Sequence, residues 1–297
     1  MGSWSGGCLC GDVRFNAAAA PDDIHYCHCT RCRKAHGGGF SVRARFPVEA
    51  VTWAGAAPKL FRSSPIAERG HCRRCGTPLL FRYLDSRHVF LSVAAFDDVA
   101  SVEPRNHWCT CDRLNWLAIV DDLPRHRDCD SADRRAALSA HGLSALPPTP
   151  RPSKGNGGCL CGDIRFETLA DPEDAQFCHC RMCQKSHGNP FAVMASFVMD
   201  EELRFLKGDP KIYKSSSFAR RGFCDRCGSP ISFAYDNEPG VVAICLGAVD
   251  DPNRWPPRAH WGVEAQVPWL VMGDGLPRRR TEDDPVFQAA QSAAGKG

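Results

Sequence analysis

The sequence predicts a mainly β protein that consists of two tandem copies of one domain. The chain has 297 residues, which is more than one domain usually contains. Its cysteine motifs recur in the same order in both halves, and its apolar residues alternate in short runs between Gly and Pro. We expect a first domain over residues 1–128, a linker over 129–154, a second domain over 155–281 and a tail over 282–297.

Three motifs carry the repeat. The first, Gly-Gly-Cys-Leu-Cys-Gly-Asp-Val/Ile-Arg-Phe, occupies residues 6–15 and 157–166. The second and third are Cys-His-Cys-x-x-Cys-x-Lys-x-His-Gly, at residues 27–37 and 178–188, and Cys-x-Arg-Cys-Gly-x-Pro, at residues 72–78 and 224–230. Repetition of all three motifs indicates two complete copies of the same unit.

Strands are the expected elements within each copy. Residues 40–46 and 191–197 alternate apolar and other side chains, and residues 89–93 and 241–246 are rich in β-branched or aromatic side chains. Only residues 131–143, between the copies, have a helical pattern, and residues 146–155 have the composition of an extended linker. We expect the chain after Thr281 to be disordered or weakly helical.

Charge and hydropathy argue against several functional classes. The chain has 37 Lys and Arg against 34 Asp and Glu, mixed in sequence, so a nucleic-acid partner is not indicated. The first residues lack the apolar core of a secretory signal, and the longest apolar run, residues 241–249, is too short to cross a bilayer. We therefore expect a cytoplasmic protein with no membrane association.

Eighteen cysteines require a chemical explanation. In a reducing cytosol, clustered cysteines are more often metal ligands than disulfides, so metal binding is favoured over a redox disulfide protein. A Cys-x-Cys in extended chain can direct both sulfurs to one ion, and a Cys-x-x-Cys-Gly turn can do the same. Together they predict a closed structural zinc site in each copy, formed by Cys8, Cys10, Cys72 and Cys75 and by Cys159, Cys161, Cys224 and Cys227.

A second cluster in each copy offers only three thiols. These are Cys27, Cys29 and Cys32 in the first copy and Cys178, Cys180 and Cys183 in the second. Three protein ligands and an open position are typical of catalytic zinc, which suits chemistry on sulfur or aldehydes. With one closed and one open site in each copy, we expect two zinc ions per domain and four per chain. The alternative is a second structural site that His28 or a remote residue closes.

Cysteines outside these clusters differ between the copies. Cys109 and Cys111 form an extra Cys-x-Cys where the second copy has Gly262 and Glu264. They could close the first open site, form a redox pair or be small buried residues. Cys129 and Cys245 have no partner in the other copy and are expected to be incidental.

Candidate catalytic groups lie near the three-cysteine motifs. His36 and His187 are plausible proton carriers, although structural histidines are equally common. Cations surround the same motifs, where they could offset thiolate charge or hold substrate carboxylates; they are Arg31, Arg33, Lys34, Arg181 and Lys185.

The combined motifs resemble the glutathione-dependent formaldehyde-activating enzyme family, which includes centromere protein V. The resemblance covers nearly the whole of both copies and implies a β-tent fold with two zinc sites in each. It implies that the quartets are structural ligands and that the triplets are catalytic ligands. The activity it implies is reversible addition of glutathione to formaldehyde, giving S-hydroxymethylglutathione.

These observations lead to two functional hypotheses. The first is a zinc-dependent carbon–sulfur lyase that acts on adducts of a small thiol, such as glutathione, with an aldehyde. The second is a non-catalytic zinc module that binds a protein or nucleic acid, because a fold does not determine a function.

Overall fold

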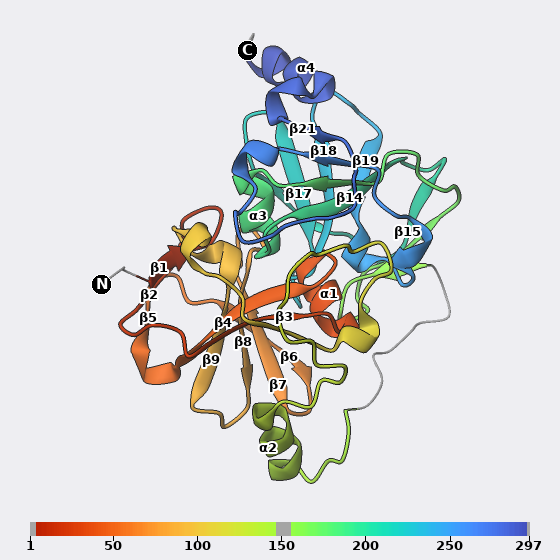
Figure 1. Cartoon of the computed structure of the whole chain (residues 1–297). Helices are drawn as coiled ribbons and strands as arrows, with labels where there is room; N and C mark the ends of the chain where they lie inside the picture. Colours follow the sequence, from red (N-terminus) through yellow and green to blue (C-terminus); the bar gives the residue numbers. More distant parts are fainter. Residues whose placement is uncertain (1–3, 147–155, 296–297) are drawn as a thin grey trace.

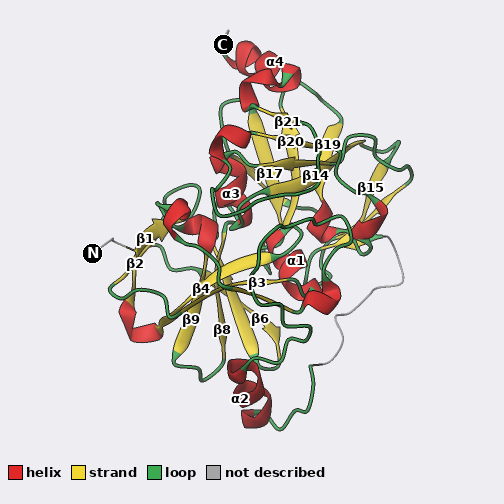
Figure 2. Cartoon of the chain, viewed as in Figure 1, coloured by secondary structure: helices red, strands yellow, loops and turns green. Residues whose placement is uncertain are grey.

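Both halves of the chain fold into β domains of the same design (Figure 1). The computed structural model describes residues 4–146 and 156–295. Each domain contains a three-stranded sheet and a larger sheet, and the described residues include four α-helices (Figure 2). The predicted mainly β class and tandem organisation are confirmed.

The first domain orders its strands as β1-β2-β5 and β10-β3-β4-β9-β8-β7-β6. Neighbours are antiparallel except β10 and β3, which are parallel. The strands are β1 (Trp4–Gly7), β2 (Val13–Ala17), β3 (Asp23–Cys27), β4 (Ser41–Pro47), β5 (Val51–Gly55), β6 (Lys59–Ser64), β7 (Ala67–His71), β8 (Pro78–Tyr83), β9 (His88–Ser92) and β10 (Asn106–Trp108). The 3-10 helices are η1 (Val48–Ala50), η2 (Val93–Ala95), η3 (Val99–Ser101) and η4 (Thr110–Asp112).

The second domain repeats this order as β11-β12-β15 and β16-β17-β18-β19-β14-β13-β20-β21. Its strands are β11 (Gly157–Gly158), β12 (Arg165–Thr168), β13 (Gln176–Cys178), β14 (Ala192–Val198), β15 (Leu203–Lys207), β16 (Lys211–Lys214), β17 (Ala219–Phe223), β18 (Pro230–Tyr235), β19 (Val241–Cys245), β20 (Ala259–Trp261) and β21 (Arg278–Arg279). The 3-10 helices are η5 (Leu246–Ala248), η6 (Pro252–Arg254), η7 (Val263–Ala265) and η8 (Thr281–Asp283).

The α-helices occupy two kinds of position. α1 (Thr30–His36) and α3 (Arg181–His187) follow β3 and β13 and pack against η5 and η2 of the opposite domain. α2 (Ala132–Ala140) and α4 (Pro285–Ala294) lie at opposite ends of the molecule (Figure 1). None of the helices within the described residues combines the length and apolarity required to span a bilayer.

The apolar alternation seen in the sequence produces the core. Phe40, Val42, Ala44 and Phe46 are all fully buried, as a period of two requires for one face of a strand. The predicted helix between the copies is confirmed as α2, whereas residues 147–155 of the expected linker lie outside the described part. The tail is more ordered than expected, because α4 follows Asp284, which caps it, and packs through Phe287 on Phe218.

The two domains share one buried interface. Phe40 of the first domain packs edge-on against Phe191 of the second, with ring centroids 5.2 Å apart. Trp116 donates its Nε1–H to the carbonyl of Pro252, and Trp269 donates in the same way to Val99. The repetition of this contact in both directions shows that the domains pack as a pseudo-symmetric pair.

Two lysines near the three-cysteine motifs belong to this interface. Lys34 Nζ lies 2.8 Å from the Asp250 carboxylate and donates to the carbonyls of Gly158 and Ala248. Its counterpart Lys185 donates to the carbonyl of Gly7. Both lysines therefore reach into the opposite domain, and the expectation that they serve the three-cysteine loops is replaced by a role in holding the domains together.

The Asp250 carboxylate provides a test of the interface. It also pairs with Arg165 at 2.6 Å, and although burial opposes it, the partners Arg165 and Lys34 lower the pKa of Asp250. Asp250→Asn leaves buried cations uncompensated and is expected to reduce the free energy of unfolding by about 3 kcal/mol at neutral pH. The matched control Asp97→Asn affects a carboxylate that is 42% exposed and should cost below about 1 kcal/mol.

Acid titration gives the sign of the same effect. A carboxyl with a lowered pKa stabilises the fold above the ordinary value of about 4, and this stabilisation is lost as the pH falls through the folded-state pKa. Denaturant unfolding from pH 7 to pH 3 should therefore show a smaller loss of stability in Asp250→Asn than in the unmodified protein. If the stability of both proteins fell equally between pH 7 and pH 3, this assignment would be contradicted.

Candidate metal centres

The four-cysteine clusters have the geometry of a closed tetrahedral site. Cys8 and Cys10 follow β1, and Cys72 and Cys75 form the turn between β7 and β8. All four sulfurs lie within 4.8 Å of one another, with Cys8 and Cys10 at 3.5 Å and Cys10 and Cys72 at 3.6 Å. Four sulfurs at about 2.3 Å from one zinc would lie about 3.8 Å apart, so the quartet fits the ion.

The second quartet repeats this arrangement. Cys159 and Cys161 lie 3.4 Å apart, and Cys161 and Cys224 lie 3.7 Å apart. The backbone N–H of Ile164 donates to Cys159 Sγ, as that of Val13 does to Cys8 Sγ. Such hydrogen bonds fix the ligand sulfurs and offset their negative charge.

The Cys-x-x-Cys-Gly turn requires glycine for two reasons: its backbone conformation and its close contact with the other domain. Gly76 takes φ 75, and a Cβ there would lie 2.3 Å from the ring of Phe223 in the other domain. Gly228 takes φ 77 against His71. Each closed cluster therefore supports the domain interface as well as its own domain.

The three-cysteine clusters are built at the start of a helix. Cys178 ends β13, Cys180 precedes α3, and Cys183 lies in the first turn of that helix. The three sulfurs lie within 4.8 Å of one another, with Cys178 and Cys180 at 3.6 Å. Arg221 donates from Nη2 to Cys183 Sγ at 3.4 Å, and its counterpart Arg69 donates to Cys32 at the same distance.

Thiol contacts shift the acidity of these clusters. Hydrogen bonds from Cys27 and Cys29 lower the pKa of Cys32 well below its ordinary value, and the positive charges of Arg43 and Arg69 act in the same direction. The same contacts raise the pKa of Cys27, so the negative charge of the cluster lies mainly on Cys32. Three sulfurs within 4.8 Å of one another suit zinc; they belong to Cys178, Cys180 and Cys183 in the second domain and to Cys27, Cys29 and Cys109 in the first.

The first triplet has an additional cysteine beside it. Cys109 Sγ lies 3.7 Å from Cys27 Sγ and is within 4.8 Å of Cys27 and Cys29. It is also bonded to Cys129, so the expectation that Cys129 is incidental is wrong. Cys111 is exposed and belongs to neither group.

The backbone at Cys109 is unusual for a cysteine. Cys109 takes φ 58, in the left-handed region, where its counterpart Gly262 takes φ 67. A non-glycine residue is disfavoured there, so placement of a sulfur beside the triplet costs conformational energy. The sulfur of Cys109 is therefore one chemical difference between the two clusters.

Each triplet faces a cavity. The first cavity measures about 490 Å³ and the second about 360 Å³. Their walls include the triplet cysteines and residues of α2 and α4; the helix residues are Ala132, Asp133 and Arg134 in the first cavity and Pro285, Val286 and Phe287 in the second. The quartets do not line either cavity. The triplets are therefore accessible to a small molecule, whereas the quartets are enclosed.

Comparison with known proteins identifies the family. The model of the family described as glutathione-dependent formaldehyde-activating enzyme matches residues 3–112 and 154–264. The chain belongs to this family. The two matches confirm the repeat found in the sequence, and they exclude α2 and α4, so the covers of both cavities lie outside the segments that define the family.

Individual relatives match parts of the chain. An uncharacterized lyase of Schizosaccharomyces pombe is 35% identical over 81 residues, which cover 27% of this chain and 58% of the relative. A putative glutathione-dependent formaldehyde-activating enzyme of Halomonas elongata is 29% identical over 125 residues, covering 38% of this chain and 79% of that protein. A crystal structure of a Rhodobacter sphaeroides protein aligns at 23% identity with a TM-score of 0.27, covering 32% of this chain and 87% of that one.

A carboxylate and two buried histidines support each triplet of this family member. His28, between two triplet cysteines, lies with Nε2 2.9 Å from His107 Nδ1, and His107 Nε2 lies 2.9 Å from the carboxylate of Asp121. Burial lowers the pKa of His28 to about 3, so its ring is neutral. His179, His260 and Asp274 repeat the chain with similar distances. These contacts hold the Cys-His-Cys segment against the neighbouring strand.

His36 and His187 lie away from both cavities, at the centre of the interface. Each Nδ1–H donates to the other's carbonyl oxygen at 2.8 Å, and the residues are 3% and 2% exposed. Burial lowers the pKa of His36 to about 3 and that of His187 to about 4. Their role in proton transfer stays a prediction, and their contacts are those of residues that join the domains.

The cavity walls contain residues that the sequence analysis did not identify. Tyr83 and Tyr235 occur at matched positions in β8 and β18, and each lines the cavity of its own domain. The repeated Phe-x-Tyr pattern in the sequence was the available signal. Arg43, by contrast, lines only the first cavity, because its position in the second domain is Met194.

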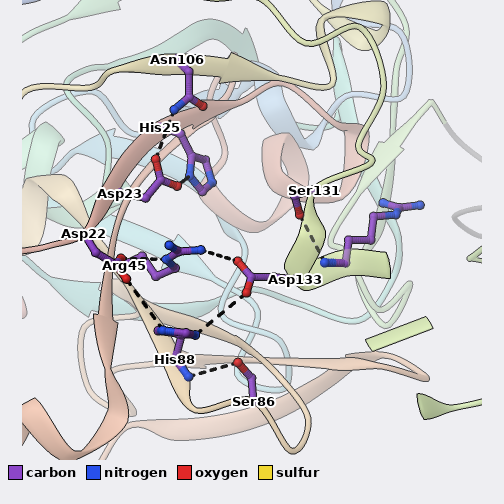
Figure 3. A network of polar contacts seen from close by, with 10 residues as sticks. Asp22, Asp23, His25, Arg45, Ser86, His88, Asn106, Ser131 and Asp133 are labelled. Atoms are coloured by element: carbon purple, nitrogen blue, oxygen red, sulfur yellow. Dashed lines mark hydrogen bonds and ion pairs between the residues drawn. The ribbon is translucent and has the colours of Figure 1, made fainter. Parts of the chain in front are cut away.

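A polar network fixes the mouth of the first cavity (Figure 3). Arg45 pairs with Asp22 and with Asp133, each at 2.7 Å, and thereby attaches the first turn of α2 to β4. Asp23 pairs with His25 at 2.6 Å and accepts a hydrogen bond from Asn106. The carboxylates at this mouth are therefore already engaged with partners on the protein.

Proposed function

We propose that the protein is a zinc-dependent carbon–sulfur lyase that acts on adducts of a small thiol, such as glutathione, with an aldehyde, such as formaldehyde. At the level of the family, the comparisons support a glutathione-related, lyase-like function. The observation that carries the proposal is that the three thiols of each triplet line a cavity among the described residues, and that the two further cysteines lining the first cavity, Cys109 and Cys129, are bonded to each other.

The triplets would hold one zinc in each domain, and the quartets one more, which makes four per chain. Bound at a triplet, zinc supplies a position for a substrate sulfur as thiolate and a means to polarise a carbonyl oxygen. The quartets leave no coordination position and serve the fold.

Protein groups around the triplet prepare it for charge. Arg221 directs a guanidinium N–H to Cys183 and offsets the charge of the thiolates. Phe233, Val286 and Phe287 form apolar walls that reduce water in the cavity. A drier site strengthens each electrostatic contact with the reacting atoms.

A tyrosine is suited to hold the proton that the reaction requires. When sulfur adds to the aldehyde, the thiol proton leaves and the carbonyl oxygen gains one to become a carbinol. Burial raises the pKa of Tyr83 to about 12 and raises that of Tyr235 still further. Each Oη therefore keeps its proton at neutral pH and can donate it to the oxygen. The thiol releases its proton to water, the tyrosinate regains one from water, and the same transfers run backwards when the adduct breaks down.

Tyr235→Phe and Tyr83→Phe test this role. Each change is expected to lower kcat of its own site by roughly 100-fold, because general acid catalysis contributes at least that much. Zinc content and the melting temperature should not change, since no metal contact is lost. Tyr213→Phe, on β16 and outside both cavities, is the matched control. An unchanged rate in the Tyr83 and Tyr235 variants would reject the assignment.

Direct assay of the zinc-loaded protein tests the function itself. Formation and breakdown of S-hydroxymethylglutathione should exceed the spontaneous rate, measured without protein and subtracted. A panel of other thiols and aldehydes then defines the substrate. Absence of excess rate across the panel would contradict the proposal.

We propose a cytoplasmic location on the same basis, because small thiols are kept reduced there.

A further inference from the structure

The two cavities differ in charge at one matched position. Arg43 in β4 and Met194 in β14 occupy matched positions, each between two buried phenylalanines of its own domain. Each residue lines the cavity of its domain. Arg31 and Met182, two residues after the middle cysteine of each triplet, repeat the contrast. One cavity has guanidinium groups where the other has thioethers.

Arg43 is buried without an acidic partner. It is 5% exposed, and its Nε and Nη1 have no hydrogen-bond partner among the described residues. Its guanidinium lies over the ring of Phe81, 4.4 Å from the centroid. A buried guanidinium with unfilled donors is costly, so a ligand that accepts from it would gain binding energy.

Nearby carboxylates do not fill this need. Asp23 is engaged with His25 and Asn106, and Asp133 and Asp22 are engaged with Arg45 (Figure 3). Arg43 forms no ion pair with any acid of the described chain within the 4.0 Å range over which the other pairs occur. An anion in the first cavity would therefore find a cation that no protein carboxylate has already neutralised.

Charge balance for the thiolates does not by itself explain Arg43. Both triplets already have a matched arginine, Arg69 or Arg221, that donates to a cysteine sulfur. The second triplet has the same three thiols with Met194 in place of the second guanidinium. The additional positive charge therefore distinguishes the first cavity from the second.

The second cavity has the opposite character. Its walls are mainly apolar and include Met182, Met194, Phe218, Phe233, Val241 and Phe287. Carboxylates of Asp174, Glu238 and Asp284 also line it, and its exposed cation, Arg279, lies over the ring of Trp261. Apolar walls and acidic groups disfavour an anionic ligand and favour an uncharged one.

We infer that the two sites take different substrates: the second cavity binds an uncharged, apolar thiol or its aldehyde adduct, whereas the first binds a thiol that carries carboxylates. This inference rests on the proposed function for the thiol chemistry, and it assigns a separate ligand class to each site. The chain then combines two specificities in one molecule. Met194 and Arg43 are the residues that select between them.

Calorimetric titration of the zinc-loaded full chain with two probes tests the inference. The probes are mercaptosuccinate, which has two carboxylates, and benzyl mercaptan, which is uncharged. We expect each probe to saturate one site and to bind independently of the other. Arg43→Met should weaken mercaptosuccinate at least tenfold and create a second site for benzyl mercaptan. Arg43→Lys is the matched control, because it keeps the charge and should retain most of the affinity.

The reciprocal change Met194→Arg should weaken benzyl mercaptan binding to the second site by a similar factor, and melting curves check that each variant is folded. If either variant is unfolded, the inference is tested by the number of sites that each probe occupies on the unmodified protein. Binding of both probes to both sites, or mercaptosuccinate affinity that Arg43→Met leaves unchanged, would overturn the inference. Calorimetry needs no turnover, so selective binding without lyase activity would reject the proposed function alone.

Discussion

Cys227→Ser is expected to unfold the second domain, whereas Cys183→Ser should leave it folded. Cys227 belongs to an enclosed quartet that joins β11 to the turn between β17 and β18, and it is almost fully buried. Binding of zinc to such a site contributes directly to folding, with apparent energies of about 10–16 kcal/mol for structural zinc. Loss of one ligand removes a large part of this energy.

Cys183 lies in α3 on the wall of an open cavity, where the three thiols join residues close in sequence. Removal of one of them disturbs a local segment and, at Cys183, the hydrogen bond from Arg221, but no metal link between distant segments. Thermal melting followed by circular dichroism, with zinc content measured on each sample, distinguishes the two classes. Cys75→Ser and Cys32→Ser form the same comparison in the first domain. Equal losses of stability in both classes would show that the open sites are misassigned.

When both thiol classes are supplied under reducing conditions, Cys183→Ser is expected to abolish most of the total lyase activity, and Cys32→Ser only a small part of it. Cys109 Sγ lies 3.7 Å from Cys27 Sγ, so once released from its bond with Cys129 it can supply a fourth thiolate to the first site. A fourth thiolate saturates a tetrahedral zinc and weakens it as an acceptor of substrate sulfur. The second domain has Gly262 at that position and no sulfur there.

Turnover of glutathione and turnover of an uncharged thiol should both be measured under reducing conditions for both variants, with zinc content determined for each. Cys109→Gly is the matched variant, because it copies Gly262 and suits the positive φ of the position. In that background the first site should gain activity, and Cys32→Ser should then cause a loss comparable to that of Cys183→Ser. A larger loss from Cys32→Ser in the unmodified protein would contradict the asymmetry.

The cysteine clusters were accessible from the sequence because their segments are repeated and local. The Cys-x-Cys and Cys-x-x-Cys-Gly segments each form one turn, and their recurrence showed which pairs belong together. Cys129 had no such signal, since its bond with Cys109 depends on how residues 125–128 return along β10. A partner that tertiary structure selects cannot be read from spacing.

Proximity to the triplets in sequence does not bring His36 and His187 to the walls of the cavities, and their role in proton transfer stays a prediction. They end the helices that begin at the triplets, but those helices point their last turns into the interface between the domains. The cavities were equally hidden, because α2 and α4 come from segments expected to be a linker and a tail. Docking of one domain on the other determines where such residues lie.

Zinc-edge X-ray absorption, before and after addition of a small thiol, tests most directly the claim that each domain pairs a closed site with an open one. With all four sites loaded and the bond between Cys109 and Cys129 intact, the average should be about 3.5 sulfurs per zinc, rising towards four when 2-mercaptoethanol fills the open positions. The double variant Cys32→Ser/Cys183→Ser should show no such rise. Four sulfurs per zinc in the untreated protein, with no change on addition of thiol, would contradict the account.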